Sequence, residues 1–123
     1  MPGMRIGVDG RALRAGGARR GTAVYLEQLL AALVREFPDD HWDVLVPGAV
    51  RAGTLPEAAS VRVVHTARAA HAAGAMVGRP RLDELLEGAD LVWVPAVLPV
   101  GLSPGARAVL TVHDLSFVHR PRD

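Results

Sequence analysis

The sequence predicts an α/β domain with an open parallel sheet and helices on both faces. Five short, largely apolar runs have the composition of strands buried on both sides: residues 4–8, 42–46, 61–64, 91–94 and 106–112. Segments with the 3.6-residue period of amphipathic helices lie between some of these runs. Helices that follow buried strands are typical of the right-handed crossovers that join parallel strands.

Length and composition restrict the chain to one folded domain. Half of its 123 residues are apolar, which suffices for a buried core, and 22% charged residues argue against disorder. The absence of cysteine excludes disulfides and thiolate metal sites. A formal net charge of +1 gives no reason to expect nucleic acid or an anionic membrane as a partner.

Two further features bear on the origin of the protein. All 14 basic residues are arginine, which together with abundant Ala, Gly and Pro indicates the coding bias of a high-GC bacterial genome. The opening MPGMRIGVDG lacks the longer apolar stretch of a signal peptide, and no window approaches the roughly 20 apolar residues of a membrane helix. We therefore expect a soluble, cytoplasmic protein.

The first unit is predicted to be a strand, a glycine-bearing loop and a helix. Residues 4–8 end at an Asp-Gly turn pair, and the segment RALRAGGARRGT at 11–22 is too rich in glycine and arginine for a regular element. Thr22 can cap a helix that Pro38 ends. One face of this helix is apolar and is expected to enter the core: Leu26, Leu29, Leu30, Leu33 and Phe37.

The remaining elements follow from shorter patterns. Residues 42–46 and 61–64 are strands bounded by Pro and Gly, and residues 81–87 (RLDELLE) form a short helix after a low-complexity Ala/Gly stretch. Trp42 and Trp93 lie inside apolar strands and are expected in the core.

Polar residues follow the ends of several strands. In open α/β sheets, ligands bind outside the carboxyl ends of the strands. Asp-Gly-Arg follows the first strand, Val-Pro ends the fourth, and His113 with Asp114 follows the fifth. Topology alone therefore places His113 and Asp114 at the edge where a ligand is expected.

The residues also resemble a known family. MRIGVDGRALR, GTAVYLEQLLAAL, ADLVWVPA and VLTVHDLSFVHRP resemble, in this order, the amino-terminal domain of retaining glycosyltransferases of family 4. These are two-domain enzymes of the GT-B fold, so the resemblance implies a Rossmann-like sheet. The similarity spans nearly the whole chain, and its beginning and the HDLSF segment are its most specific parts.

The resemblance implies transfer of a sugar from a nucleotide-sugar donor to an acceptor, with retention at the anomeric carbon. The amino-terminal domain would receive the acceptor, which is a carbohydrate, a lipid or another small molecule, and no cofactor or metal is expected. At 123 residues the chain would be a partial amino-terminal domain, inactive without a carboxyl-terminal domain. The sequence also allows two further interactions, peripheral contact with a membrane and self-association of the chain.

The family's site residues map onto several positions of this sequence. His113 matches the histidine that faces the transferred sugar, and Gly16, Gly17 and Gly21 match the loop near the donor diphosphate. The loop departs from the family pattern where Ala23 replaces a glycine and Val24 an arginine.

Each candidate also has a plainer structural interpretation. His113 can bond a sugar hydroxyl or face a leaving phosphate, or it can only cap a strand end; Asp114 can orient it or cap the loop. The glycine loop can present N–H groups and a helix amino terminus to phosphate, or it can be only a turn. Arg19 and Arg20 can assist there or be merely solvated.

Asp9 can bind acceptor hydroxyls, or it can bond the turn formed by Gly10 and Arg11, which we favour slightly. A metal site at His113, Asp114 and His119 is not expected, because a second set of histidine and carboxylate ligands is missing.

The alternative function is a stand-alone nucleotide-binding or regulatory module of the same fold class. A receiver domain would need clustered acidic residues after the first strand and a lysine after the last, and the sequence has no lysine. A dinucleotide-binding domain would need a tight glycine fingerprint between strand and helix, whereas this loop is long.

Overall fold

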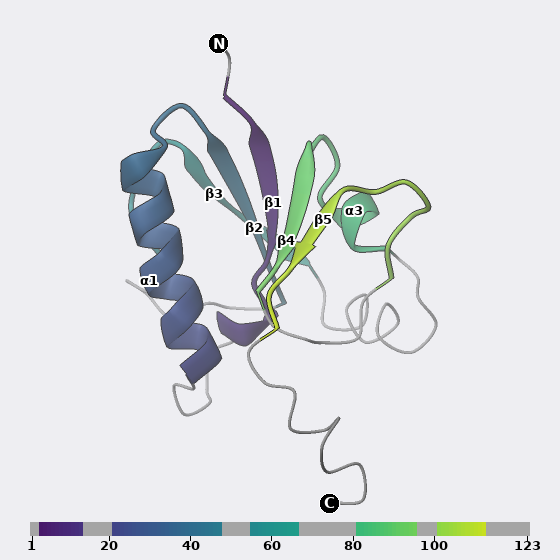
Figure 1. Ribbon diagram of the computed structural model, residues 1–123, viewed down its shortest axis with the longest axis horizontal. Helices are drawn as coiled ribbons and strands as arrows, with labels where there is room; N and C mark the ends of the chain where they lie inside the picture. Colours follow the sequence, from purple (N-terminus) through teal and green to yellow (C-terminus); the bar gives the residue numbers. More distant parts are fainter. Residues whose placement is uncertain (1–2, 14–20, 48–54, 67–80, 96–100, 113–123) are drawn as a thin grey trace, which may run out of the picture.

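The computed structural model describes residues 3–13, 21–47, 55–66, 81–95 and 101–112. The elements in chain order are β1 (Arg5–Asp9), the 3-10 turn η1 (Arg11–Leu13), α1 (Gly21–Glu36), β2 (His41–Pro47), β3 (Val61–Thr66), α3 (Leu82–Leu85), β4 (Leu91–Val94) and β5 (Ala108–Leu110) (Figure 1). All five predicted strands are confirmed, with ends that differ from the prediction by at most two residues.

The strands form one parallel sheet in the order β3-β2-β1-β4-β5. Ile6 of β1 pairs with Trp42 of β2 on one side and with Leu91 of β4 on the other. The chain adds β2 and β3 on one side of β1 and then crosses to add β4 and β5 on the other. The predicted open parallel sheet is confirmed, and Figure 1 shows all strands ending at the same edge.

One face of the sheet is covered by α1. Alternate residues of β1, β2 and β4 pack with the buried side of the helix in one core: Ile6, Val8, Leu13, Ala23, Leu26, Leu30, Trp42, Val44, Val46 and Trp93. The predicted burial of both tryptophans is confirmed, because Trp42 and Trp93 are 4% and 6% exposed.

The prediction that Phe37 belongs to the core is wrong. Its side chain is 54% exposed, although Leu26 and Leu30 are buried as predicted and Leu29 and Leu33 are partly buried. The α1 helix ends at Glu36, so the helical period no longer holds at Phe37, and the chain turns there toward β2.

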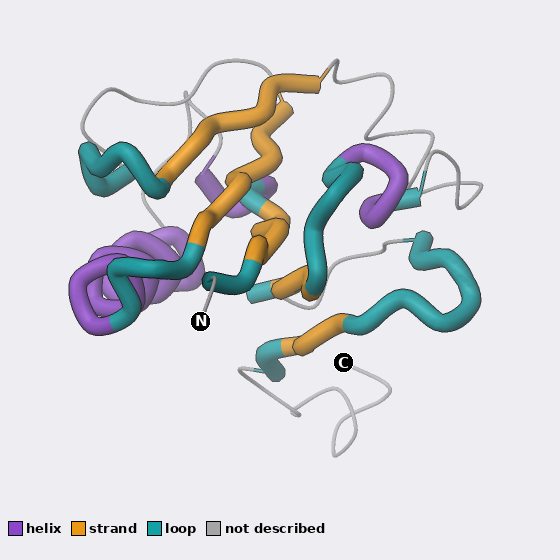
Figure 2. Tube along the Cα trace, turned by 90° about the horizontal axis from the view of Figure 1, so that it is seen from above, coloured by secondary structure: helices purple, strands orange, loops and turns teal. Residues whose placement is uncertain are grey.

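The opposite face carries α3 and a smaller core (Figure 2). Leu82 and Leu86 pack there with residues of β2 and β4, namely Leu45, Val92 and Val94. Close packing needs Gly7 in β1, since a Cβ at that position would lie 2.8 Å from Leu86 Cδ1. Helices on both faces are thus confirmed, although α3 is shorter than the predicted 81–87. Arg81 is extended and Leu86 already has non-helical backbone, so the helix covers only Leu82–Leu85.

The segment after β1 is more regular than predicted. Arg11–Leu13 forms the 3-10 turn η1, in which the Leu13 backbone N–H donates to the Gly10 carbonyl at 2.9 Å. Leu13 is only 3% exposed and joins the core beneath α1, so burial of one leucine stabilises a turn in a segment of low propensity. Thr22 lies inside α1 and is not its cap, because Gly21 already has helical backbone.

The outer strand β5 is the least covered part of the sheet. It is shorter than the predicted 106–112, and the chain enters it through a turn at Gly105, where φ is 82°. Val109, Leu110 and Val112 are about half exposed, at 48%, 54% and 47%. No helix in the described part of the chain is both long and apolar enough to cross a membrane.

Candidate functional site

The carboxyl edge of the sheet is the candidate site. The strand order reverses between β1 and β4, and in open parallel sheets this reversal leaves a crevice where ligands bind. The α1 helix runs antiparallel to the strands, so its first residue, Gly21, lies at the same edge as η1 (Figure 1). The first N–H groups of a helix have no partner within the helix and carry a partial positive charge, which can attract an anion.

A buried ion pair closes the end of β1. The Arg11 guanidinium donates from Nε to Asp9 Oδ1 and Oδ2, at 3.0 and 2.9 Å, and from Nη2 to Oδ2 at 2.7 Å. The Arg11 backbone N–H also donates to Oδ1, at 3.1 Å. The exposed fractions of the two side chains are 2% for Asp9 and 15% for Arg11. Both carboxylate oxygens are therefore engaged by a residue only two positions away.

This geometry supports the turn interpretation of Asp9. A carboxylate that accepts four hydrogen bonds from its own turn is held in one orientation and is neutralised by the arginine. Binding of acceptor hydroxyls would have to compete with these bonds. Arg11 was not among the predicted site residues, although a charge two positions after Asp9 was a visible signal of such a pair.

Gly10 lets the turn lie directly against β2. Its N–H donates to the Leu45 carbonyl at 2.8 Å. A Cβ at Gly10 would lie 2.7 Å from that oxygen and 2.9 Å from the Cγ1 atoms of Val44 and Val46. The turn after β1 is therefore packed against backbone that cannot easily move, and it directs η1 along this edge.

A chain of contacts joins α1, β4 and the end of β5. The Tyr25 ring meets the Trp93 ring edge-on, with centroids 6.5 Å apart and an interplanar angle of 72°. Trp93 Nε1 donates to Thr111 Oγ1 at 3.0 Å. Thr111 stands two residues before the predicted His113. The hydrogen bond from Trp93 therefore links the chain to the core just before that histidine. Sequence reasoning placed Trp93 in the core but missed its hydrogen bond.

The predicted site residues fall into two groups. Asp9 and Gly21 are described: Asp9 is bound to Arg11, and Gly21 is exposed, with nothing within 4 Å of a Cβ built on it. The other candidates lie outside the described residues: Gly16, Gly17, Arg19, Arg20, His113, Asp114 and His119.

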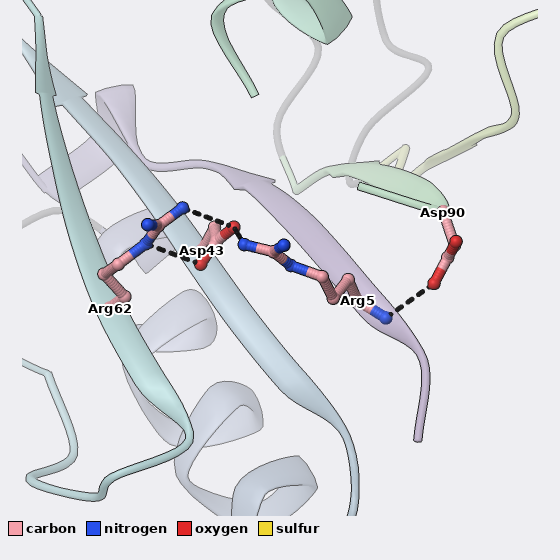
Figure 3. Close-up of polar contacts among 4 residues, drawn as sticks. All are labelled: Arg5, Asp43, Arg62 and Asp90. Carbon is pink, nitrogen blue, oxygen red and sulfur yellow. Dashed lines mark hydrogen bonds and ion pairs between the residues drawn. The ribbon is translucent and has the colours of Figure 1, made fainter. Parts of the chain in front are cut away.

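A second ionic cluster lies toward the amino-terminal edge, where the strands begin (Figure 3). Asp43 of β2 accepts from Arg5 Nη2 at 3.1 Å, and from Arg62 Nε and Nη2 at 3.1 and 3.0 Å. The Arg5 backbone N–H donates to Asp90 Oδ2 at 2.9 Å. These bonds link the starts of four neighbouring strands, and we assign to them a role in holding the strands together.

Asp83 fastens α3 to the loop before β5. Its Oδ1 accepts from the Ser103 backbone N–H at 2.8 Å. Partial burial alone would raise the pKa of Asp83. Hydrogen bonds from the Ser103 hydroxyl and backbone, a bond from its own backbone and the charge of Arg81 outweigh this, so that the pKa is lowered from its ordinary value of 3.8.

Among the described residues, no group of three or more His, Asp or Glu side chains could hold a metal ion. Comparison of the chain with protein-family models, with curated proteins and with solved structures finds no match in any of the three. The structure therefore defines the fold class alone: an α/β domain with an open parallel sheet of five strands and helices on both faces.

Proposed function

We propose that the chain is the amino-terminal, acceptor-side part of a retaining glycosyltransferase of family 4. The observation that supports this most is the sheet order β3-β2-β1-β4-β5 with all strands parallel, because ligands of such sheets bind where the strand order reverses, which here is between β1 and β4. The start of α1 lies at the same edge, beside the turn of Asp9 and Arg11. The family resemblance of the sequence supplies the chemistry proposed for this edge of the sheet.

The proposed reaction moves a sugar from a nucleoside diphosphate to an acceptor hydroxyl. The bond between the anomeric carbon and the diphosphate oxygen breaks, a bond to the acceptor oxygen forms on the same face, and the acceptor proton is released. The diphosphate leaves with increased negative charge. Rate enhancement would come chiefly from positioning of the acceptor and from electrostatic stabilisation of that leaving group.

The candidate residues take separate roles in this proposal. His113 would donate a hydrogen bond to the transferred sugar, and Asp114 would orient that imidazole. N–H groups of the loop that holds Gly16, Gly17 and Gly21, with the amino terminus of α1, would face the diphosphate, and Arg20 would add positive charge. Asp9 would shape the turn through Arg11 instead of contacting the acceptor directly.

The partners that follow are a nucleotide sugar, an acceptor and a carboxyl-terminal domain that holds the nucleotide. The alternative, a stand-alone nucleotide-binding or regulatory module, shares the same fold class and predicts binding without transfer. Only the chemistry therefore distinguishes the two.

A transfer assay on the protein as its gene encodes it tests the proposal. A panel of uridine, guanosine and adenosine diphosphate sugars is offered with mono- and disaccharide and lipid acceptors. Mass spectrometry detects the product, and NMR of the anomeric proton reports retention. We expect transfer from at least one donor. Tight nucleotide binding with no transfer from any donor would favour the binding module instead.

The His113→Ala variant tests the residue assignment within the same assay. We expect kcat to fall about 100-fold or more, while the melting temperature stays unchanged. His41→Ala is the matched control, because His41 is an exposed histidine at the start of β2, on the opposite edge of the sheet. Equal activity of the two variants would assign His113 to capping the strand end.

A further inference from the structure

We draw no further inference here: the strongest candidate, the half-exposed apolar edge that Val109, Leu110 and Val112 form on and just after β5, carries no proposal because nothing in the structure shows what covers it.

Discussion

Asp9 and Arg11 show how one charged residue is kept inside an apolar sheet. A carboxylate removed from water is costly unless it is paired and its lone pairs are satisfied. Here the partner is supplied by the turn that immediately follows the strand, and both oxygens are engaged. The pair therefore gives the end of β1 one defined geometry.

Removal of Arg11 is expected to destabilise the protein strongly. Arg11→Ala leaves the Asp9 carboxylate buried without its guanidinium, at a cost of about 3–5 kcal/mol in the free energy of unfolding. The double variant Asp9→Asn/Arg11→Gln should lose less stability than the sum of the losses in Asp9→Asn and Arg11→Gln, because no unpaired buried charge remains in it. Urea-induced unfolding measures all of these values.

Arg35→Ala is the control for the Arg11 experiment. Arg35 pairs with Glu36 at 3.7 Å, but its side chain is 72% exposed, and exposed pairs contribute little. We expect no measurable change in stability for this variant. An Arg11→Ala variant as stable as Arg35→Ala would contradict the role assigned to the buried pair.

Gly10 is expected to tolerate no side chain. Gly10→Ala places a Cβ 2.7 Å from the Leu45 carbonyl oxygen, and overpacking of this kind costs about 1–3 kcal/mol. Gly21→Ala is the matched control, because a Cβ there meets nothing within 4 Å and alanine favours helix. Thermal unfolding of both variants provides the test, and an equal melting temperature for the two would refute the packing argument.

At the scale of elements, the two helices depend on different interactions. The α1 helix has sixteen residues and a continuous buried stripe, which its sequence period already shows. The α3 helix has only four residues, fewer than an isolated helix needs. Its place depends on tertiary contacts: Leu82 and Leu86 in the smaller core, the space that Gly7 leaves, and the Asp83 bond to Ser103.

The Asp83 contact predicts a pH-dependent contribution to stability. Because the folded-state pKa is lowered, the contribution is fully present above the ordinary value of 3.8 and is lost as pH falls through the lower, folded-state pKa. Asp83→Asn should therefore be less stable than the unchanged protein at pH 7, and the difference should shrink steadily below about pH 4.

Denaturant unfolding between pH 7 and pH 2.5 measures this difference. Glu87→Gln serves as the control, since it removes an exposed carboxylate just after α3 and leaves the Ser103 bonds intact. It should match the unchanged protein at pH 7. A difference between Asp83→Asn and the unchanged protein that stays constant down to pH 2.5 would mean that ionisation of Asp83 does not stabilise the fold.

At the scale of the whole molecule, each edge of the sheet carries its own set of buried or partly buried ion pairs. The Arg5, Asp43 and Arg62 cluster lies toward the edge where the strands begin, whereas the Asp9 and Arg11 turn lies where they end. The crossover from β3 to β4 places β4 beside β1 and so determines which strand ends become neighbours.

The proposed division of labour between two domains predicts the behaviour of the 123-residue chain by itself. Because the nucleotide would be held by the carboxyl-terminal domain, the chain should show no turnover with nucleotide sugars. Isothermal titration calorimetry should show binding no tighter than the millimolar range, about 4 kcal/mol of binding free energy. A Kd below about 1 µM would contradict the two-domain assignment.

Much of the fold could be predicted because its signals are local. The apolar runs located each strand in the described part of the chain, and the leucine period located the buried face of α1, since both depend only on neighbouring residues. Part of the candidate site could be predicted for the same reason. Asp9 and Arg11 are two residues apart, and a hydrogen-bonded turn between them was the favoured interpretation. Phe37 was misplaced because a period does not show where a helix ends.

Sequence by itself thus determined the fold class, the positions of the strands and the edge where a ligand is expected. Only the tertiary structure decided that β4 joins β1 on the side opposite β2, that Leu13 is buried, and that Asp43 serves arginines from two other strands. The physical reason is the distance along the sequence over which the deciding interactions act. Local propensity and periodicity are properties of adjacent residues, whereas strand order and ion pairing depend on contacts between segments that meet only when the chain has folded.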